Sequence, residues 1–328
     1  MAILITGATG YIGSSLTFKL AGLGQEVRLL CRQKPTSPAY NRPNIHLAIG
    51  DINDKPSLEA AMKDVTQVYH LAAYARLWAK DPGTFHKINV EGTRLVLESA
   101  KKAGVQKVVY TSTAGVIGPS DNTPMDENRP RITGFFNHYE TTKADSEEVC
   151  RQFTKDGLPV VIVNPARVYG PGLDTVSNPV TKIMERYIKK NWKVIPGNGN
   201  DVGSYCHVED VVNGHILAME KGRGGERYIM GGVNSTFNEL MNAISTTSGV
   251  KLKLYHIPFP LLKMFSHLQM LKANITGISP MITPDWVAKY EYDWALDSSK
   301  AVNELGYHIR TLQDGVGQTI EWLRQNRM

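Results

Sequence analysis

The sequence predicts an α/β protein with a doubly wound parallel sheet and a smaller C-terminal lobe. In the first half of the chain, short and continuously apolar runs alternate with longer amphipathic ones, and this alternation ends at about residue 165. Alternating strands and helices indicate βαβ units. Continuously apolar strands indicate a sheet that helices cover on both faces.

The predicted elements follow in order along the chain. Apolar runs predict strands at 2–7, 26–31, 68–73, 107–112 and 159–164, and amphipathic runs predict helices at 11–24, 56–64 and 84–104. Beyond them, turn-rich segments mix with helices at roughly 178–190, 208–219 and 237–247. We therefore expect a sheet domain over 1–165, to which a segment near 204–219 returns, and a second lobe formed mainly by 166–328.

Composition excludes several classes of protein. The net charge of +6 arises from 37 basic and 31 acidic residues that are scattered along the chain, so we expect no nucleic-acid partner. The three cysteines, Cys31, Cys150 and Cys206, form no CxxC pair, and we expect neither a disulfide nor a metal site. Without a signal peptide or a long apolar run, the expected location is cytoplasmic.

Two further segments carry specific expectations. Residues 119–136 hold three prolines and many polar side chains, which is typical of a mobile loop and places a lid before the helix that follows. Residues 258–276 are densely apolar, with two lysines and no acid. We expect a cap over a pocket or a core helix there and no membrane contact, with an interfacial helix on a lipid surface as the alternative.

A glycine-rich turn follows the first predicted strand. Gly7, Gly10 and Gly13 have the spacing GxxGxxG and open the first helix. Glycine allows the backbone N–H groups to approach a pyrophosphate, and the helix N-terminus favours negative charge. The turn, with Thr9, Tyr11 and Ile12, therefore predicts a dinucleotide site, whereas close packing of the helix on the strand would need only one of the glycines.

The end of the second strand bears on the choice of cofactor. Enzymes that prefer NAD place an acid there to bind the ribose hydroxyls. Here Cys31 holds that position and Arg32 follows it. Because a guanidinium matches phosphate geometry, we expect NADP, with NAD as the alternative cofactor and an exposed, poorly discriminating Arg32 as the other interpretation.

A tyrosine and a lysine stand four residues apart in "HYETTK". On a helix, Tyr139 and Lys143 would share one face. With "TGATGYIG", "HLAA", "NVEGT" and "VVYTST", this motif resembles the extended short-chain dehydrogenase/reductases in order and spacing. The resemblance extends to "HVEDVV" and "DSSKAVNELGY", and is greatest to the dihydroflavonol-reductase and 3β-hydroxysteroid-dehydrogenase branch, with hopanoid-associated epimerase-like proteins nearby.

The resemblance implies a catalytic set on a Rossmann-type domain. Tyr139 would donate or accept the proton, and the Lys143 ammonium would favour its phenolate and hold the nicotinamide ribose. Thr113, or Ser112 beside it, would hydrogen-bond the substrate carbonyl. Asn89 would support the site, although a buried asparagine that satisfies backbone groups explains it equally well.

The resemblance also implies further contacts. The cofactor would bind near the adenine to Asp51 and Ile52, along one wall to Leu71, Ala72 and Ala73, and around the nicotinamide to Thr111, Ser112, Pro165 and Val168. The second lobe would bind a small-molecule substrate. Helices near 84–103 and 137–155 would join a homodimer.

Three classes of function compete: net reduction of a carbonyl, redox-neutral epimerisation or dehydration of a nucleotide sugar, and non-catalytic cofactor sensing. A dehydratase of this family needs two acids after the threonine, where this chain has Ala114 and Gly115. A nucleotide-sugar epimerase needs cations for the diphosphate, but Gly203 stands where an arginine is usual. A second arginine is usual near residue 290, where this chain has only Lys289. Arg167 and Arg186 are the residues that could replace the missing arginines.

Reduction of a carbonyl is the expected activity. The candidate pocket residues are mainly apolar or aromatic and suit a small hydrophobic ketone or aldehyde, although each of them could instead be ordinary core. They are Tyr74, Trp78, Phe135 and Tyr205 beside Thr113, with Leu77, Phe136 and Trp286 as further candidates. Epimerisation remains the alternative, and a non-catalytic cofactor sensor would be expected to lose the Tyr139–Lys143 pair, which is intact.

Overall fold

The computed structural model describes residues 2–175 and 178–328. In this part of the chain the largest sheet has seven parallel strands in the order β10-β6-β5-β4-β1-β2-β3. Their bounds are β1 Ala2–Thr6, β2 Val27–Cys31, β3 Ile45–Ile49, β4 Val65–His70, β5 Lys107–Thr111, β6 Val160–Pro165 and β10 Arg227–Met230. The strand order reverses between β1 and β4, and ligands of such sheets bind at that switch point.

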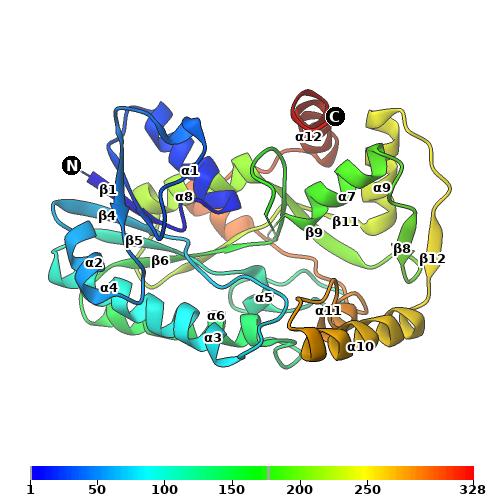
Figure 1. The fold of residues 1–328 in the computed structure, drawn as a ribbon, viewed down its shortest axis with the longest axis horizontal. Helices are drawn as coiled ribbons and strands as arrows, with labels where there is room; N and C mark the ends of the chain where they lie inside the picture. Colours follow the sequence, from blue (N-terminus) through cyan, green and yellow to red (C-terminus); the bar gives the residue numbers. More distant parts are fainter. Residues whose placement is uncertain (1, 176–177) are drawn as a thin grey trace.

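Helices cover both faces of this sheet (Figure 1). One face carries α1 Tyr11–Gly22 and α8 Val208–Lys221, and the other carries α2 Lys55–Ala61, α4 Gly92–Lys102 and α6 His138–Lys155. Successive strand residues point to opposite faces, so Ile3 and Ile5 join one core cluster while Leu4 joins the other. The predicted doubly wound fold is confirmed.

The C-terminal half builds a smaller lobe around short strands. β9 Val202–His207 pairs with β7 Arg167–Tyr169 and with β11 Val233–Thr236, and β8 Val194–Pro196 pairs with β12 Tyr255–Ile257. The helices α7 Pro179–Ile188, α9 Phe237–Ser248 and α12 Leu312–Asn326 pack into one core cluster beside these strands (Figure 1). α9 begins with a capping box between Thr236 and Glu239, which satisfies its free N–H groups.

The division into two domains stays a prediction. α8 packs against β5 and β6, as expected for a segment near 204–219 that returns to the sheet. β10, which lies beyond that segment, forms the sheet edge next to β6. The short π-helical turn Ala301–Leu305 also packs against α8, so more of the C-terminal half returns to the sheet than the sequence indicated.

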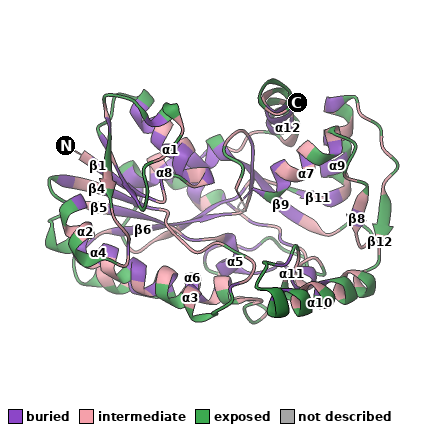
Figure 2. Cartoon of the chain, viewed as in Figure 1, coloured by how far each residue is buried: buried purple, intermediate pink, exposed green. Residues whose placement is uncertain are grey.

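Two elements differ from the prediction. The edge strand β3 was not predicted because His46 interrupts its apolar run, and of its five side chains only Ile45 is buried. The second case is α10 Phe259–Thr276, of which only Ser266 and Ala273 are buried. The expectation of a core helix at 258–276 is therefore wrong, because most of the apolar side chains of α10 face outward (Figure 2).

The remaining small elements connect these layers. They are the 3₁₀ turn Pro38–Tyr40, α3 Gly83–His86, the π-helical turn Lys87–Glu91, α5 Ala114–Ile117 and α11 Pro284–Lys289. Cys31 and Cys206 are buried in their strands, as the apolar patterns predicted. No helix in the described residues is long and apolar enough to cross a membrane.

Candidate functional site

The glycine turn lies where β1 ends, at the switch point of the sheet. Gly7 has φ +73°, and a Cβ atom there would lie 2.6 Å from the backbone nitrogen of Ala72 in the loop after β4. A Cβ on Gly13 would overlap the Gly7 carbonyl oxygen. Gly10 caps α1 without a side chain, and the first turn of α1 holds no acid. The N-terminus of α1 is therefore open to an anion, and the turn fits a dinucleotide pyrophosphate.

The predicted neighbours of Gly10 play different parts. Thr9 is exposed and Ile12 is half-buried. Tyr11 is buried, and its hydroxyl donates to the Gly170 carbonyl at 2.9 Å. The phenol of Tyr11 thus links α1 to the segment after β7. The predicted contact of Tyr11 with the cofactor stays a prediction, and the backbone of Tyr11 is the part left to make it.

The residues that would surround an adenosine come from the ends of β2 and β3. Cys31 is buried, whereas Arg32 is exposed and forms no ion pair within the described residues. Asp51 holds its own loop, because its Oδ1 accepts from the backbone nitrogen of Asn53 at 2.9 Å. Ile52 is buried against Gly92 at the start of α4.

The loop after β4 forms a wall beside Gly7. Leu71, Ala72 and Ala73 are half-buried and follow the strand, which ends at His70. His70 Nδ1 lies 2.6 Å from Thr6 Oγ1, and the same hydroxyl accepts from the Ala72 nitrogen at 3.2 Å. Burial lowers the pKa of His70 to about 3, and the Lys143 ammonium lowers it further in the same direction. A neutral His70 thus fixes this wall, a role that the sequence analysis did not identify.

The nicotinamide side is formed by the ends of β5, β6 and β7. Pro165 ends β6, and Val168 is buried in β7. The Thr111 hydroxyl lies 2.8 Å from Nε2 of His215 on α8, so its side chain is already engaged. These positions border the predicted site, and their contacts with a cofactor stay predictions.

Tyr139 and Lys143 occupy successive turns at the start of α6. Asn137 caps this helix by accepting from the Glu140 nitrogen at 3.0 Å. Lys143 is 1% exposed. Its ammonium donates to the Thr111 carbonyl at 2.7 Å and lies 4.0 Å from the centre of the Tyr110 ring. The helix predicted from the spacing is present, and it directs Lys143 to the end of β5.

The structure separates the two hydroxyl candidates after β5. The Thr113 hydroxyl lies near enough to the Tyr139 phenol to lower its pKa, and it accepts from the Gly115 nitrogen at 3.1 Å as the cap of α5. Ser112 points elsewhere and donates to the buried Glu147 at 2.6 Å. Thr113 is therefore the hydroxyl that the fold places beside the tyrosine.

Burial shifts the pKa of both catalytic candidates, Tyr139 and Lys143, in the direction that favours the uncharged form. Burial, together with the Glu140 carboxylate, raises the pKa of Tyr139 to about 12, and the bond from Thr113 lowers it only in part. Burial lowers the pKa of Lys143 to about 7. The expected effect of the lysine on the phenolate is not among these causes, and the ammonium points to the Thr111 carbonyl. Near neutral pH, Tyr139 is a neutral phenol that can donate a proton.

Asn89 lies in the π-helical turn Lys87–Glu91, between α3 and α4. Its Oδ1 accepts from the Tyr74 nitrogen at 2.7 Å, and its Nδ2 donates to Thr142 at 3.0 Å. Its carbonyl accepts from Ser146 at 2.8 Å. Asn89 thus joins the loop after β4 to α6, and π-helical turns of this kind are frequent at functional sites.

The predicted substrate residues lie on three separate segments. Tyr74 packs edge-on against Phe85, with 4.9 Å between ring centres, and its hydroxyl donates to the Trp78 carbonyl at 3.3 Å. Phe135 is 42% exposed beneath the guanidinium of Arg131. Tyr205 is only 2% exposed. The substrate contact of Tyr205 stays a prediction, and its ring has little free surface for it.

The comparisons with known proteins fit this geometry. Residues 3–231 match the family described as the NAD dependent epimerase/dehydratase family. The chain belongs to this family. It is 29% identical over 328 residues to a putative dihydroflavonol 4-reductase of Synechocystis sp. (strain ATCC 27184 / PCC 6803 / Kazusa), and the match covers 98% of this chain and 94% of that protein.

Two further comparisons span nearly the whole chain. A 4-hydroxy-2-methyl-3-oxo-4-farnesyl-3,4-dihydroquinoline-1-oxide ketoreductase of Stigmatella aurantiaca is 29% identical over 331 residues, with 99% of this chain and 96% of that protein covered. The crystal structure of UDP-glucose 4-epimerase with UDP-glucose from Thermotoga maritima superposes with a TM-score of 0.83 at 26% identity, over 100% of both chains. The chain is therefore a nicotinamide-dependent enzyme of the extended short-chain dehydrogenase/reductase type.

In this chain, a buried carboxylate next to Tyr139 organises the site. Glu140 is 0% exposed, and its two oxygens accept from Lys289 at 2.6 Å and from Arg131 at 2.8 Å. The Phe136 nitrogen donates to it at 3.1 Å. Glu140 thereby connects α6 with residues 119–136 and with α11. The sequence analysis missed this residue.

Arg167 occupies the space above Gly203. A Cβ atom on Gly203 would overlap the Arg167 guanidinium, so no larger residue fits there without moving it. The guanidinium lies over the rings of Tyr205 and Tyr290, at 5.6 and 5.8 Å from their centres. It has no carboxylate partner within the described residues. Arg186, the other predicted substitute, is exposed on α7.

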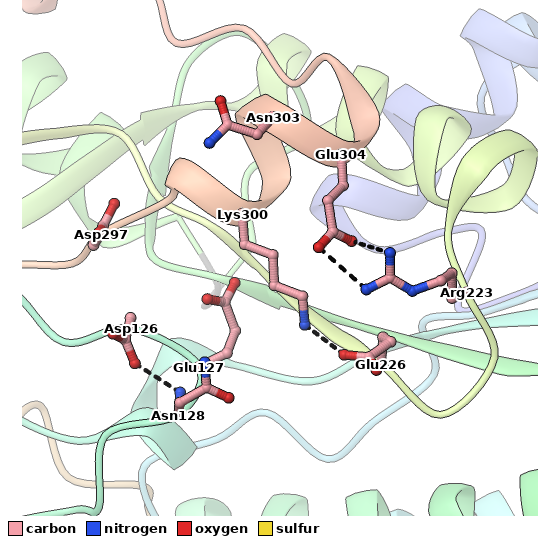
Figure 3. A pocket seen from close by; sticks show the side chains of 9 residues that line it. All are labelled: Asp126, Glu127, Asn128, Arg223, Glu226, Asp297, Lys300, Asn303 and Glu304. Carbon is pink, nitrogen blue, oxygen red and sulfur yellow. Dashed lines mark hydrogen bonds and ion pairs between the residues drawn. The ribbon is translucent and has the colours of Figure 1, made fainter.

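Two cavities lie outside these groups. One, of about 430 Å³, is lined by Asp126, Glu127, Asn128, Arg223, Glu226, Asp297, Lys300, Asn303 and Glu304 (Figure 3). Lys300 pairs with Glu226 and Arg223 pairs with Glu304, and the remaining carboxyl groups of Asp126, Glu127 and Asp297 make the lining acidic. The second, of about 800 Å³, lies at the start of α10. Neither cavity contains a predicted site residue.

Proposed function

We propose that this enzyme reduces the carbonyl group of a small hydrophobic ketone or aldehyde to an alcohol, with NADPH as its coenzyme. The observation that carries the proposal is the placement of the Thr113 hydroxyl beside a neutral Tyr139, on the helix whose next turn holds the buried Lys143. A phenol whose pKa is raised to about 12 remains protonated at neutral pH and serves as a general acid.

The side chains have distinct parts in this mechanism. Thr113 and Tyr139 would donate hydrogen bonds to the substrate carbonyl oxygen and polarise it. The bound coenzyme supplies the hydride that the carbonyl carbon accepts. Tyr139 gives its hydroxyl proton to the oxygen, which completes the alcohol and leaves a phenolate. Lys143, whose pKa near 7 allows it to carry a proton at working pH, would stabilise that phenolate until it is protonated again.

The end of β2 supports the choice of coenzyme. Arg32 is exposed at the end of β2, and no acid stands at the position of Cys31. A guanidinium there would bind the 2′-phosphate of NADP. The Arg32→Ala variant should raise KM for NADPH by about tenfold or more, which corresponds to one charge-assisted bond, and leave KM for NADH unchanged. The exposed Lys34→Ala serves as the matched control, and an equal effect on both coenzymes would remove the NADP assignment.

Two observations favour an apolar substrate. Trp286, Tyr290 and Trp294 surround the Lys289 end of the Glu140 cluster. The Stigmatella relative carries the name of a ketoreductase acting on a farnesylated compound.

Epimerisation of a nucleotide sugar is the second candidate, and Arg167 is the observation that favours it. The guanidinium stands in the space above Gly203, where related epimerases carry an arginine for the diphosphate, and it lacks a carboxylate partner within the described residues. The similarity to a UDP-glucose epimerase points the same way. Dehydration is disfavoured, because Ala114 and Gly115 offer no acid and the carboxylate of Glu140 near Gly115 is bound by two cations.

The deciding experiment follows NADPH consumption by absorbance with a panel of hydrophobic ketones and aldehydes. Turnover that falls by at least about 100-fold in Tyr139→Phe supports the reductase. Tyr187→Phe is the matched control, because it removes a buried hydroxyl that donates to the Val250 carbonyl at 3.1 Å in the smaller lobe, at a position that is not a predicted site residue. Inactivity on every carbonyl, together with Tyr139-dependent interconversion of UDP-sugars, would establish the epimerase instead. A homodimer through α4 and α6 remains a prediction that light scattering tests.

A further inference from the structure

The outer face of α10 is strongly apolar. Its exposed side chains, together with two residues that follow the helix, have exposed fractions between 41% and 76% and are coloured as exposed in Figure 2. They are Leu261, Met264, Phe265, Leu268, Leu271, Ile275, Ile278 and Met281. We call this set the α10 face. Contiguous exposed apolar patches on soluble proteins mark interaction sites.

The spacing of these residues places them on one side of the helix. Leu261, Phe265 and Leu268 follow each other at four and three residues, which is the spacing of a helical stripe. The opposite side carries Ser266 and Ala273, which are the buried residues of α10, and packs toward α11. The helix is therefore anchored by its small residues and presents its large ones to the outside.

Charge identifies the partner of this face. Residues 240–284 contain no Asp or Glu, whereas Lys251, Lys253, Lys263 and Lys272 lie within them. Lys263 is neutralised by Glu291 at 2.7 Å. Lys272 is exposed and stands four residues from Leu268, on the apolar side itself. An anionic lipid surface suits this combination, because the alkyl chain of a lysine can lie in the apolar layer while its ammonium reaches a headgroup phosphate.

A second copy of the chain fits less well. A two-fold contact places the same patch on both subunits, so it would bring the Lys272 ammonium groups of two α10 faces into a desolvated interface without an acid in 240–284 to compensate them. Lipid headgroups supply the missing negative charge.

The cavity of about 800 Å³ adjoins the same helix. Pro258, Phe259 and Pro260, at the start of α10, line it together with Asp201 and Glu291. Gly203 and Tyr290, which stand close to Asp201 and Glu291 in the sequence, both lie against Arg167, and its guanidinium lies over the ring of the predicted substrate residue Tyr205. A molecule held at a lipid surface beside α10 would thus meet this cavity before the substrate residues.

We propose that the α10 face docks the enzyme on an anionic membrane surface, with the cavity at the start of α10 turned toward the lipid. The proposal does not depend on which carbonyl or sugar the enzyme converts. The proposal takes up the alternative that the composition of 258–276 left open, against the expectation of no membrane contact.

The test is co-sedimentation of the full chain with sucrose-loaded vesicles of phosphatidylcholine, with and without phosphatidylglycerol. The protein should bind the vesicles that contain phosphatidylglycerol and bind pure phosphatidylcholine more weakly. Leu268→Gln should lower the partition coefficient by about tenfold or more, because one large apolar side chain no longer enters the lipid. Lys272→Gln should lower it by about fivefold on anionic vesicles only.

The matched control is Leu23→Gln, which alters a similarly exposed leucine (58%) at the end of α1. It should bind like the unmodified chain, and the thermal melting of every variant confirms its folding. Failure of the folded protein to bind anionic vesicles overturns the proposal. The proposal is also overturned if light scattering shows a dimer that Leu268→Gln converts to a monomer while vesicle binding is unchanged. A second copy of the chain would then cover the α10 face.

Discussion

Replacing Glu140 by glutamine removes the charge that joins three segments around Tyr139. The carboxylate is fully buried and accepts from Lys289 at 2.6 Å, from Arg131 at 2.8 Å and from the Phe136 nitrogen at 3.1 Å. The Arg131 and Lys289 side chains are only 12% and 17% exposed. Glutamine keeps the shape but leaves two buried cations close together without a counter-ion.

The expected loss of folding stability follows from this geometry. Removing one partner of a buried ion pair costs about 3–5 kcal/mol, because the charge that remains is uncompensated. For a chain of 328 residues, with an unfolding entropy of about 2.1 cal/mol/K per residue, that loss lowers Tm by roughly 4–7 °C.

The same change should lower the pKa of Tyr139. Glu140 is the charged group that raises this pKa toward about 12, and the cations left behind act in the opposite direction. A donor tyrosine works below its pKa, so the alkaline limb of the activity profile should move to lower pH.

The assay compares thermal melting of Glu140→Gln with that of Glu148→Gln. Glu148 lies on the same helix, is 64% exposed and pairs with Arg151 at 2.9 Å, so its loss should change Tm by less than about 1 °C. The double variant Glu140→Gln with Lys289→Met should recover part of the loss, because one of the two unpaired cations is gone. Equal melting of Glu140→Gln and Glu148→Gln, or no recovery in the double variant, would refute the reasoning.

Three further predictions concern the site itself. Without cofactor, the stability of the unmodified protein relative to Lys143→Met should rise by up to about 1.4 kcal/mol per pH unit between about pH 7 and 10. The reason is that the pKa of Lys143 is about 7 in the folded protein and higher in the unfolded chain, so that only the unfolded chain binds the proton in this pH range. Denaturant titrations at several pH values measure this, and parallel curves would contradict it. Gly7→Ala should abolish binding of the coenzyme in calorimetry, because its Cβ would collide with the backbone of the loop after β4 at φ +73°. Gly24→Ala, at φ +76° with open space, should lose only stability, so coenzyme binding by Gly7→Ala at full affinity would remove the turn from the site. Thr113→Val should lower kcat, whereas Ser112→Ala should lower Tm and leave kcat within about threefold; the reverse result would reassign the hydroxyl.

The parts of the site that could be predicted are those encoded locally. The glycine turn needs residues within a few positions of each other, and Tyr139 and Lys143 need only one turn of helix. Glu140 was not predictable in this way, because its burial depends on Lys289, which lies 149 residues away in the sequence. Its neighbours in the sequence are polar, and nothing in the pattern distinguishes it from a solvated helix residue.

Two structural misses have similar causes. β3 is an edge strand in which only Ile45 is buried, and His46 interrupts the continuous apolar run that marks a central strand. α10 has the density of apolar residues that is typical of a core helix, and hydrophobicity alone cannot tell which surface those residues will meet. In both cases the missing information is the identity of the neighbouring element.

The charges around Tyr139 also bear on the choice between reduction and epimerisation. A reductase needs only a protonated tyrosine at the moment of hydride transfer, and both burial and Glu140 favour the protonated form. An epimerase must use the same group first as a base and then as an acid, which demands a pKa near the working pH. In this chain the carboxylate that opposes the phenolate is itself fixed by Arg131 and Lys289, so the site without cofactor is biased toward proton donation. Loss of Glu140 should therefore harm reduction at alkaline pH more than it harms alcohol oxidation, and a variant with equal losses in both directions would remove this electrostatic argument for a reductase.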